Sequence, residues 1–343
     1  MSEKTVRVAL DAMGGDNAPD APIDGALLAL TRSDEISIML VGREDDIRRS
    51  LSGKEYDDSR ITIVNAAEVI EMAEHPVNAI RRKKDSSIVV GLNLVKDGQA
   101  DIFVSAGSTG AVLVGGQLIT GRIKGVDRAP IAAVYPTTSG GAVLIDSGAN
   151  MDPRVKNIRQ YAVMGSIYAR EVMGIQNPTV GLLNIGAEEE KGNAFYIEAH
   201  KALKETPGIN FTGNIEARDF PMGKVDVVVC DAFTGNIVLK TLEGTAKALL
   251  GMVKQGLMSS LRSKIGGLLI KPALKGTLKK MDASEYGGAP LLGLKGLVVK
   301  THGSATAKEV CNTLLQCPSF VNNNIVEKIT ASLAELEENE PQE

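Results

Sequence analysis

The sequence predicts an α/β fold, an α/β/α sandwich built on a mostly parallel sheet. Apolar runs of four to eight residues recur along the 343-residue chain, and small polar residues and then a helical pattern follow most of them. Glycine is abundant, with 36 residues, while aromatic residues make up only 3% of the chain. Such alternation of strands and helices is typical of a parallel sheet that helices cover on both faces.

Nine strands are expected, at residues 6–10, 36–41, 61–64, 102–105, 132–135, 143–145, 180–184, 225–230 and 297–300. Helices are expected to begin near Pro22, Asp45, Ala79, Thr109, Lys156, Asn193, Gly235 and Ala305. We see no internal repeat and no linker rich in proline and serine. We therefore expect a single domain over residues 1–343, whose end, from about residue 335 to 343, is an acidic helix that frays into a solvated tail.

Composition narrows the class of protein. The net charge of −4 and the scarcity of aromatic residues argue against a general nucleic-acid binder. Only three cysteines occur, which suggests a reducing compartment. The first residues lack the pattern of a signal peptide, and no uncharged apolar stretch approaches the length of a membrane span. The expected location is the cytoplasm, including the cytoplasmic surface of a membrane.

The loop after the first strand is the most informative local feature. It contains Asp11, Gly14, Gly15, Asp16 and Asn17. Glycine permits a positive φ and close backbone approach, and the aspartates and asparagine can hydrogen-bond either the local backbone or a ligand. Ligands of open α/β sheets bind at the carboxyl ends of strands. An ordinary turn between strand and helix remains the alternative.

Loops of the same kind follow later strands. Their candidate binding residues are Ser108, Thr109, Asp146, Asn150, Asn184, Asp231, Thr234 and His302. Each loop alone reads as a turn with a good helix cap. Because all of them are expected at the strand ends of one sheet, we predict one shared cleft. Its N–H and O–H donors, some of them at helix N-termini, would suit phosphate.

Several common sites are missing from the sequence. There is no glycine-rich dinucleotide fingerprint after a strand, no P-loop and no nucleophile elbow, which argues against an ordinary Rossmann dehydrogenase, a P-loop ATPase and a serine hydrolase. The cysteines and the three histidines are too scattered to form a metal site. We expect Cys230 to be a buried core thiol.

One segment, at about residues 244–284, is strongly basic. Between residues 244 and 281 it has eight lysines and arginines and no acidic residue. Its apolar residues recur at helical spacing and are expected to mark one helix face, interrupted at Gly266, Gly267 and Pro272. The residues that would touch a membrane are Leu257, Leu261, Ile265, Leu268, Lys264 and Lys271. A helix packed on the body or on another subunit is the equal alternative.

Seven motifs in order resemble those of the bacterial acyl-ACP:phosphate acyltransferases of phospholipid synthesis. They lie at residues 11–19, 105–111, 144–150, 183–192, 225–236, 286–293 and 302–305, and the resemblance runs from about residue 5 to about residue 330. Two positions depart from the pattern, with alanine at Ala217 and Ala232 where glycine is usual. Each change slightly restricts the backbone and touches no catalytic role.

The resemblance implies an enzyme that moves a fatty acyl group from acyl carrier protein to inorganic phosphate. The acyl phosphate then serves a membrane acyltransferase that acylates glycerol 3-phosphate. It also implies a homodimer, peripheral to the inner face of the cell membrane, with a fold similar to isopropylmalate and isocitrate dehydrogenases and to phosphotransacetylases. No cofactor or metal is expected.

Lys191 and Asn236 are the expected catalytic residues. Lys191 would pair with phosphate or with the developing oxyanion, against the alternative of an exposed salt bridge. Asn236 would act with it, against the alternative of a helix cap. The basic run at residues 81–84 could dock the acidic carrier protein, although a solvated helix face, or docking near Arg262 and Lys264, is also open.

Two rival functions remain at this point. A decarboxylating dehydrogenase of the same fold would need clustered aspartates as metal ligands and a nucleotide site. A membrane scaffold without catalysis would use only the basic segment and leave the polar loops without a purpose.

Overall fold

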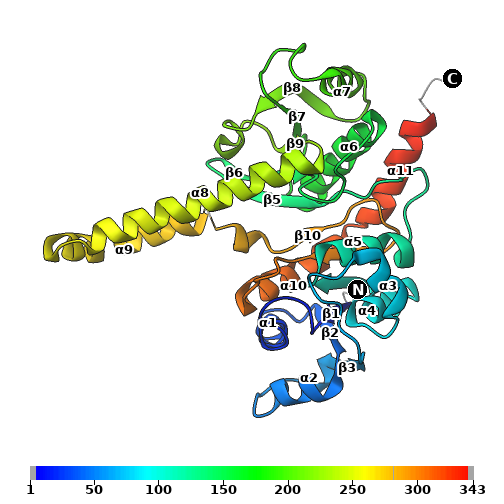
Figure 1. The fold of residues 1–343 in the computed structure, drawn as a ribbon, viewed down its shortest axis with the longest axis vertical. Coiled ribbons are helices and arrows are strands. Elements are labelled where there is room, and N and C mark those ends of the chain that lie inside the picture. The colour runs from blue at the N-terminus through cyan, green and yellow to red at the C-terminus, as the bar shows by residue number, and fades with distance from the viewer. Residues whose placement is uncertain (1–4, 281, 339–343) are drawn as a thin grey trace.

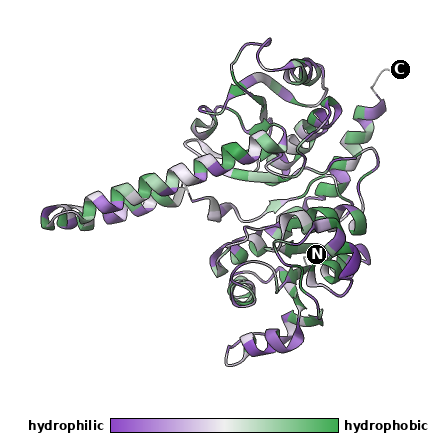
Figure 2. Cartoon of the chain, viewed as in Figure 1, coloured by the Kyte–Doolittle hydropathy of each residue, from purple (hydrophilic) through white to green (hydrophobic). Residues whose placement is uncertain are grey.

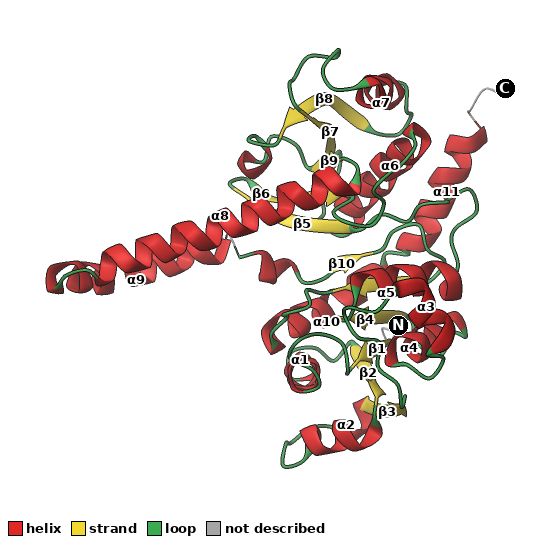
Figure 3. Ribbon diagram, in the orientation of Figure 1, coloured by secondary structure: helices red, strands yellow, loops and turns green. Residues whose placement is uncertain are grey.

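The computed structural model describes residues 5–280 and 282–338. Its strands form two separate sheets, each with helices packed against it (Figures 1 and 3). In the first sheet the order is β10 (Ala289–Pro290), β11 (Leu297–Lys300), β4 (Ile102–Ser105), β1 (Val6–Asp11), β2 (Ile36–Gly42) and β3 (Ile61–Asn65). In the second it is β5 (Ala132–Thr137), β6 (Gly140–Ile145), β9 (Val227–Val229), β7 (Thr179–Asn184) and β8 (Asn210–Glu216).

The α/β class with mostly parallel sheets is confirmed, while the expectation of a single sheet is wrong. Among the described strands, the pairs β10–β11 and β5–β6 are antiparallel and the other pairs are parallel. The second sheet starts with the tight β5–β6 hairpin at Thr138 and Ser139. A buried strand has the same apolar pattern in either sheet, so the pattern could not assign each strand to its sheet.

All nine expected strands are present, and each expected helix start lies within three residues of an observed one. The strands that were missed are β8 and the two-residue β10. β8 lies at the edge of its sheet and reads Asn-Phe-Thr-Gly-Asn-Ile-Glu, so it lacks a continuous apolar run. The helix α4 (Ser87–Lys96) was also missed, although Ser86 caps its first turn.

The helices complete two lobes. The first lobe holds the first sheet with α1 (Asp20–Leu30), α2 (Glu44–Leu51), α3 (Pro76–Arg82), α4, α5 (Thr109–Gly115) and α10 (Ala307–Asn322). The second holds the second sheet with α6 (Val155–Glu171) and α7 (Ala194–Lys204), and α11 (Ile325–Glu338) packs on α6. Short helical turns are η1 (Asp58–Arg60), η2 (Gly116–Thr120), η3 (Phe220–Met222) and η4 (Ala283–Tyr286).

Alternate strand residues enter different cores. In β1, Val8 and Leu10 pack with α1 and α10, while Ala9 packs with α4 on the opposite face. In β9, Val227 and Val229 join the first of these cores, which therefore runs through both lobes, and Val228 packs under the start of α8 (Ala232–Met258). Because most strands of each sheet pair in parallel, their carboxyl ends, and the polar loops after them, lie at one edge of the sheet.

The basic segment forms an antiparallel helical hairpin that projects away from both lobes (Figure 1). Its helices are α8 and α9 (Leu261–Lys280). The expected interruption at Gly266, Gly267 and Pro272 is wrong, because α9 runs through all three. The chain instead turns at Ser259 and Ser260, and Ser260 Oγ accepts a hydrogen bond of 3.1 Å from Ser263 N. A serine N-cap thus decides where the second helix begins.

The apolar residues therefore do not form one helix face. Leu257 packs inside the hairpin beside Gly267, whereas Leu261, Ile265 and Leu268 are exposed at its far end. Apolar and polar residues alternate along both helices (Figure 2). No helix of residues 5–280 and 282–338 is long and apolar enough to cross a membrane. The acidic helix at the C-terminus is confirmed up to Glu338, and the expected tail beyond it falls outside the described residues.

Candidate active site

Three loops interlock at the carboxyl edge of the first sheet. They follow β1, β4 and β11. Asp16 N donates to Gly303 O at 2.8 Å, and Asn17 Nδ2 donates to Ser304 O at 3.3 Å and to Ala305 O at 3.2 Å. This edge carries the group that we name the first cluster: Asp11, Gly14, Gly15, Asp16, Asn17, Ser108, Thr109, Lys300 and His302.

Gly15 makes this close approach possible. Its φ is +96°, a conformation that residues with a side chain rarely adopt, and an added Cβ would lie 2.8 Å from Gly303 O and 2.9 Å from Ala106 Cβ. The neighbouring Gly14 lies directly over Asp11 and Gly107 N. Only glycine therefore fits between the three loops at these two positions.

Asp11 supports the first cluster from beneath. Its side chain is 1% exposed, and its carboxylate accepts from Ser105 Oγ at 2.7 Å and from Met13 N at 3.1 Å. Burial raises the pKa of Asp11, against the effect of these hydrogen bonds. By contrast, Asp16, Asn17, Thr109 and His302 are the exposed side chains of the first cluster.

Lys300 is a member of the first cluster that the sequence reasoning missed. It ends β11 and is only 8% exposed. Its ammonium donates to Ala106 O at 3.3 Å and to Thr301 O. Burial lowers the pKa of Lys300 to about 8, and the carboxylates of Asp11 and Asp16 oppose this shift. The sequence offered one sign of this burial: the lysine directly follows the apolar run Leu-Val-Val, at the end of a buried strand.

Ser108 and Thr109 stand at the start of α5. Ser108 is its N-cap residue, and its Oγ accepts from Ala111 N at 3.5 Å. Gly107 N donates to Ser105 Oγ at 3.0 Å, so this loop is connected to Asp11 through one serine. The loop after β4 is thus held in place by the loop after β1.

The second lobe contributes a separate group of loops. We name it the second cluster: Asp146, Asn150, Asn184, Lys191, Tyr196, Asp231, Thr234 and Asn236. Asp146 is fully buried, and its carboxylate accepts from Ile131 N at 3.2 Å, Ala149 N at 2.9 Å and Asn150 N at 2.8 Å. Burial raises the pKa of Asp146, and these hydrogen bonds oppose the shift. Asp146 therefore holds the loop after β6.

Asp231 joins two helices of the second cluster. It is the N-cap of α8, and its carboxylate accepts from Thr234 N at 2.9 Å, from Thr234 Oγ1 at 2.6 Å and from the hydroxyl of Tyr196 on α7. Burial opposes the charge, yet these hydrogen bonds lower the pKa of Asp231. Tyr196 was missed from the sequence because a tyrosine in the first turn of a helix carries no sign of a partner 35 residues away.

Lys191 and Asn236 both lie in the second cluster. Asn184 Nδ2 donates to Lys191 O at 3.0 Å, which closes the loop after β7, and the side chain of Lys191 is exposed. Asn236 is half-buried on the first turns of α8, beside Gly148. Asp231, rather than Asn236, is the residue that caps α8. Asn236 is therefore not committed to the helix-cap role that was its alternative.

The loop after β6, in the second cluster, borders a core group of the first lobe. Asn150 Nδ2 donates to Ala129 O at 3.0 Å, and Ala149 packs against the core group that contains Ala111 and Val112 of α5. The structure brings the candidate residues of each lobe together within that lobe. It gives no direct contact between Lys191 or Asn236 and the loops of the first lobe.

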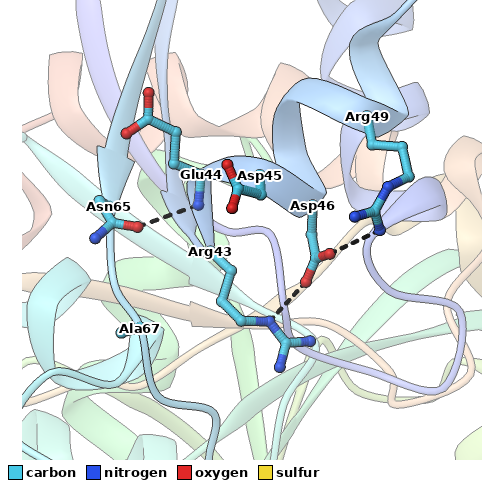
Figure 4. A pocket seen from close by; sticks show the side chains of 7 residues that line it. All are labelled: Arg43, Glu44, Asp45, Asp46, Arg49, Asn65 and Ala67. Carbon is cyan, nitrogen blue, oxygen red and sulfur yellow. Dashed lines mark hydrogen bonds and ion pairs between the residues drawn. The ribbon is translucent and has the colours of Figure 1, made fainter.

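A polar pocket of about 710 Å³ lies outside both clusters (Figure 4). It occupies the same edge of the first sheet, beyond β2 and β3, and Arg43, Asp46 and Arg49 line part of it. Asp46 pairs with both arginines, at 2.6 and 2.9 Å. The lining carries three carboxylates against two arginines, and both arginines are already paired with Asp46, so we assign this pocket no ligand. A second cavity, of about 480 Å³ around Tyr168 and Gln316, lies at the opposite end of the second sheet from the second cluster.

The three cysteines are free and buried, as expected for Cys230. Burial, together with the charges of Asp146 and Asp231, raises the pKa of the Cys230 thiol well above its ordinary value. This thiol is therefore unsuited to act as a nucleophile. Within the described part of the chain no group of three or more histidine, cysteine, aspartate or glutamate residues could hold a metal ion.

Solved structures share this fold. A phosphotransacetylase from Streptococcus pyogenes has a TM-score of 0.62 at 17% identity, with 93% of this chain and 94% of that chain covered. The EutD phosphotransacetylase from Staphylococcus aureus has a TM-score of 0.59 at 17% identity, with 93% and 95% covered. At this identity the likeness shows the fold alone.

Sequence relatives show the family. The family described as "Fatty acid synthesis protein" matches residues 6–328. A protein of Clostridium acetobutylicum named phosphate acyltransferase is 47% identical over 329 residues, which cover 96% of this chain and 99% of that protein. One of Alkaliphilus oremlandii with the same name is 46% identical over 335 residues, or 98% and 99%. The rival dehydrogenase and scaffold functions are thereby set aside: the chain belongs to the phosphate acyltransferase family and is an acyltransferase.

Proposed function

We propose that this enzyme transfers a fatty acyl group from acyl carrier protein to inorganic phosphate. A phosphate oxygen attacks the thioester carbonyl, the carbon–sulfur bond breaks, and the thiolate of the carrier leaves with the electron pair. The products are acyl phosphate and free carrier. A membrane glycerol 3-phosphate acyltransferase would then consume the acyl phosphate in phospholipid synthesis.

This reaction needs no covalent enzyme nucleophile. Phosphate is already an oxygen nucleophile at neutral pH, and a thiol with a pKa of about 8.5 is a good leaving group. The enzyme must hold the two reactants together, which can contribute about 7–11 kcal/mol, and it must stabilise the oxyanion, where one donor contributes about 3–4 kcal/mol. Loops rich in N–H and O–H groups can do both.

We assign the two tasks to the two clusters. The exposed donors of the first cluster would hold phosphate or the pantetheine arm, with Asp11 holding the loop beneath them. In the second cluster Lys191 and Asn236 would stabilise the transition state, and Asp146, Asn184 and Asp231 would hold their loops. Exposed apolar side chains lie beside these two residues and offer a surface for the acyl chain: Ile185, Phe233 and Ile237, which are 80%, 61% and 49% exposed.

One observation carries the proposal. Donor-rich loops follow the strands of both lobes, and the loop after β6 packs on a core group of the first lobe, in a chain nearly half identical to proteins named phosphate acyltransferases. The resemblance of the motifs supports acyl-ACP as the acyl donor.

The decisive experiment incubates purified enzyme with acyl-ACP and inorganic phosphate and detects acyl phosphate by mass spectrometry. We expect acyl phosphate only when both substrates are present. Lys191→Ala and Asn236→Ala should each lower kcat by about 100-fold or more. Lys201→Ala, which removes an exposed lysine from α7, is the matched control and should leave kcat unchanged. Release of free fatty acid without acyl phosphate would overturn the proposal.

We propose that the hairpin binds two partners, a second copy of the chain and the surface of the membrane. Leu249, Met252 and Val253 are exposed along α8, and Leu261, Ile265 and Leu268 are exposed near the tip. Lys264 and Lys271 would meet anionic headgroups at the inner face of the membrane, at roughly 1 kcal/mol for each lysine. Delivery of the product there avoids exposing its chain to water, at about 0.8 kcal/mol per CH₂.

The combined variant Leu261→Glu with Ile265→Glu separates the two roles. If the tip enters a membrane, the variant should stay dimeric and active on acyl-ACP but no longer sediment with anionic liposomes. A monomeric or unfolded variant would show that these residues are structural. The control is Leu249→Glu with Val253→Glu on the shaft of α8, which should instead impair dimerisation.

The basic run at residues 81–84 is our candidate for docking the carrier protein. Lys83 pairs with Glu74 at 2.6 Å and also donates to Val69 O, while Arg81 and Arg82 are exposed. We propose that these two arginines meet the acidic carrier. Arg81→Glu with Arg82→Glu should then raise KM for acyl-ACP and reduce its dependence on salt. An unchanged KM would move docking elsewhere, for example to Arg262 and Lys264.

A further inference from the structure

Lys300 is a buried cation at the point where the three loops of the first cluster meet. Its strand β11 pairs with β4, where Lys300 lies opposite Ser105, and β4 pairs with β1. Its ammonium binds Ala106 O in the loop after β4 and Thr301 O in its own loop. An ammonium has three N–H donors, and these two hydrogen bonds leave one for a further acceptor.

The three loops provide little other positive charge. Residues 11–17, 105–109 and 300–305 contain one lysine, one histidine and no arginine, against the two carboxylates of Asp11 and Asp16. Asp11 is already engaged by Ser105 and Met13. A phosphate group that entered this cluster would meet net negative charge if Lys300 were absent, and it would be repelled.

We propose that Lys300 binds the phosphate substrate and supplies the positive charge of the phosphate subsite. This inference rests on the proposed function and deepens it, because it places inorganic phosphate in the first cluster and leaves the thioester to the second. The third N–H of the ammonium donates to a phosphate oxygen. The carbonyls of Ala106 and Thr301 hold the ammonium in place, so little side-chain freedom is lost on binding.

The charge of Lys300 then makes phosphate affinity depend on pH. The charged groups that face it are Asp11 on β1 and Asp16 on the loop after β1. Its neighbours Ser105, at the end of β4, and Ala106, in the loop after it, carry no charge, and His302 lies in the loop that follows Lys300. With a pKa of about 8, the free enzyme loses this charge as the pH rises through that value. A bound phosphate favours the charged form, so binding above this pH takes up a proton.

The experiment measures KM for inorganic phosphate and kcat at saturating acyl-ACP for wild type, Lys300→Met and Lys300→Arg. Loss of a charge-assisted hydrogen bond should raise KM for phosphate about 10- to 100-fold in Lys300→Met, with a smaller effect on kcat. Lys300→Arg should recover part of the phosphate affinity, and the alkaline rise in KM for phosphate should move to higher pH. Lys295→Met, at an exposed lysine of the preceding loop, is the matched control and should behave as wild type.

Calorimetry with inorganic phosphate alone provides a second, independent measurement. Titrations in two buffers of different ionisation enthalpy should show proton uptake above pH 8 for wild type. Lys300→Met should show neither this proton uptake nor the alkaline rise in KM for phosphate. This measurement on wild type keeps the inference testable even if Lys300→Met does not fold.

The outcomes separate this inference from the proposed function. An enzyme that makes acyl phosphate, with the same KM for phosphate and the same pH profile in wild type and Lys300→Met, overturns the role of Lys300 alone. Phosphate binding that depends on Lys300, without acyl phosphate from acyl-ACP, would overturn the proposed acyl donor and leave the subsite in place. A fall in kcat alone, with unchanged phosphate affinity, would show that Lys300 only supports the fold of the loops.

Discussion

Replacement of Gly15 by alanine tests whether the loops of the first cluster interlock as described. Gly15 has a φ of +96°, where an alanine costs about 1–2 kcal/mol of stability. The new Cβ would also lie 2.8 Å from Gly303 O and 2.9 Å from Ala106 Cβ. Such overpacking costs about a further 1–3 kcal/mol. We therefore expect Gly15→Ala to lower the free energy of unfolding by about 2–5 kcal/mol.

Gly53 provides the matched control. Its φ is +76°, and an added Cβ would meet nothing within 4 Å. Gly53→Ala therefore carries the backbone cost alone, about 1–2 kcal/mol, without the collision. The difference between the two variants isolates the collision between loops, at about 1–3 kcal/mol.

Urea denaturation of both variants gives the stabilities, and initial rates against phosphate concentration give the activity. The collision should separate the loop after β1 from Gly303, next to the hydrogen bond of Asp16. A displacement of about 1 Å can cost up to about 100-fold in rate, so kcat/KM for phosphate should fall about 10- to 100-fold in Gly15→Ala and stay unchanged in Gly53→Ala. Equal stabilities, with full activity in Gly15→Ala, would refute the interlocked arrangement.

Three further predictions concern the second cluster. The pKa of Asp231 is lowered in the folded chain, so its contribution to stability is fully present above its unfolded pKa of about 3.9 and is lost as the pH falls through the folded value. In urea denaturation across this pH range, Asp231→Asn should abolish the loss of stability that Asp231 causes in acid. An unaltered dependence of stability on pH would contradict this prediction. Tyr196→Phe removes a donor to this carboxylate, so it should lower the free energy of unfolding by about 1.5–3 kcal/mol. The loss of stability in acid should then begin at a higher pH. A shift to lower pH would contradict the hydrogen bond. Because the Cys230 thiol is buried and its pKa is raised, iodoacetamide should label it only in denaturant, as mass spectrometry can check, and rapid labelling of the native enzyme would disprove its burial.

The local chemistry of the sequence determined the type of each element and the character of its loop. Apolar runs followed by Gly, Ser, Asp and Asn predicted strands and the polar turns after them, because burial and turn formation depend on neighbouring residues. Asp11, Gly15 and Asp231 were identified from such patterns, and each lies in a strand-end loop. The family followed from motifs of the same local kind.

The tertiary structure alone decided how these elements combine. The division into two sheets depends on which strands pair, and strands of one pattern can pair in several orders. The hydrogen bond between Tyr196 and Asp231 and the burial of Lys300 join residues that are far apart in sequence. A lysine at a strand end reads as a solvated charge until loops from three distant segments close over it, and only then does its burial lower its pKa to about 8.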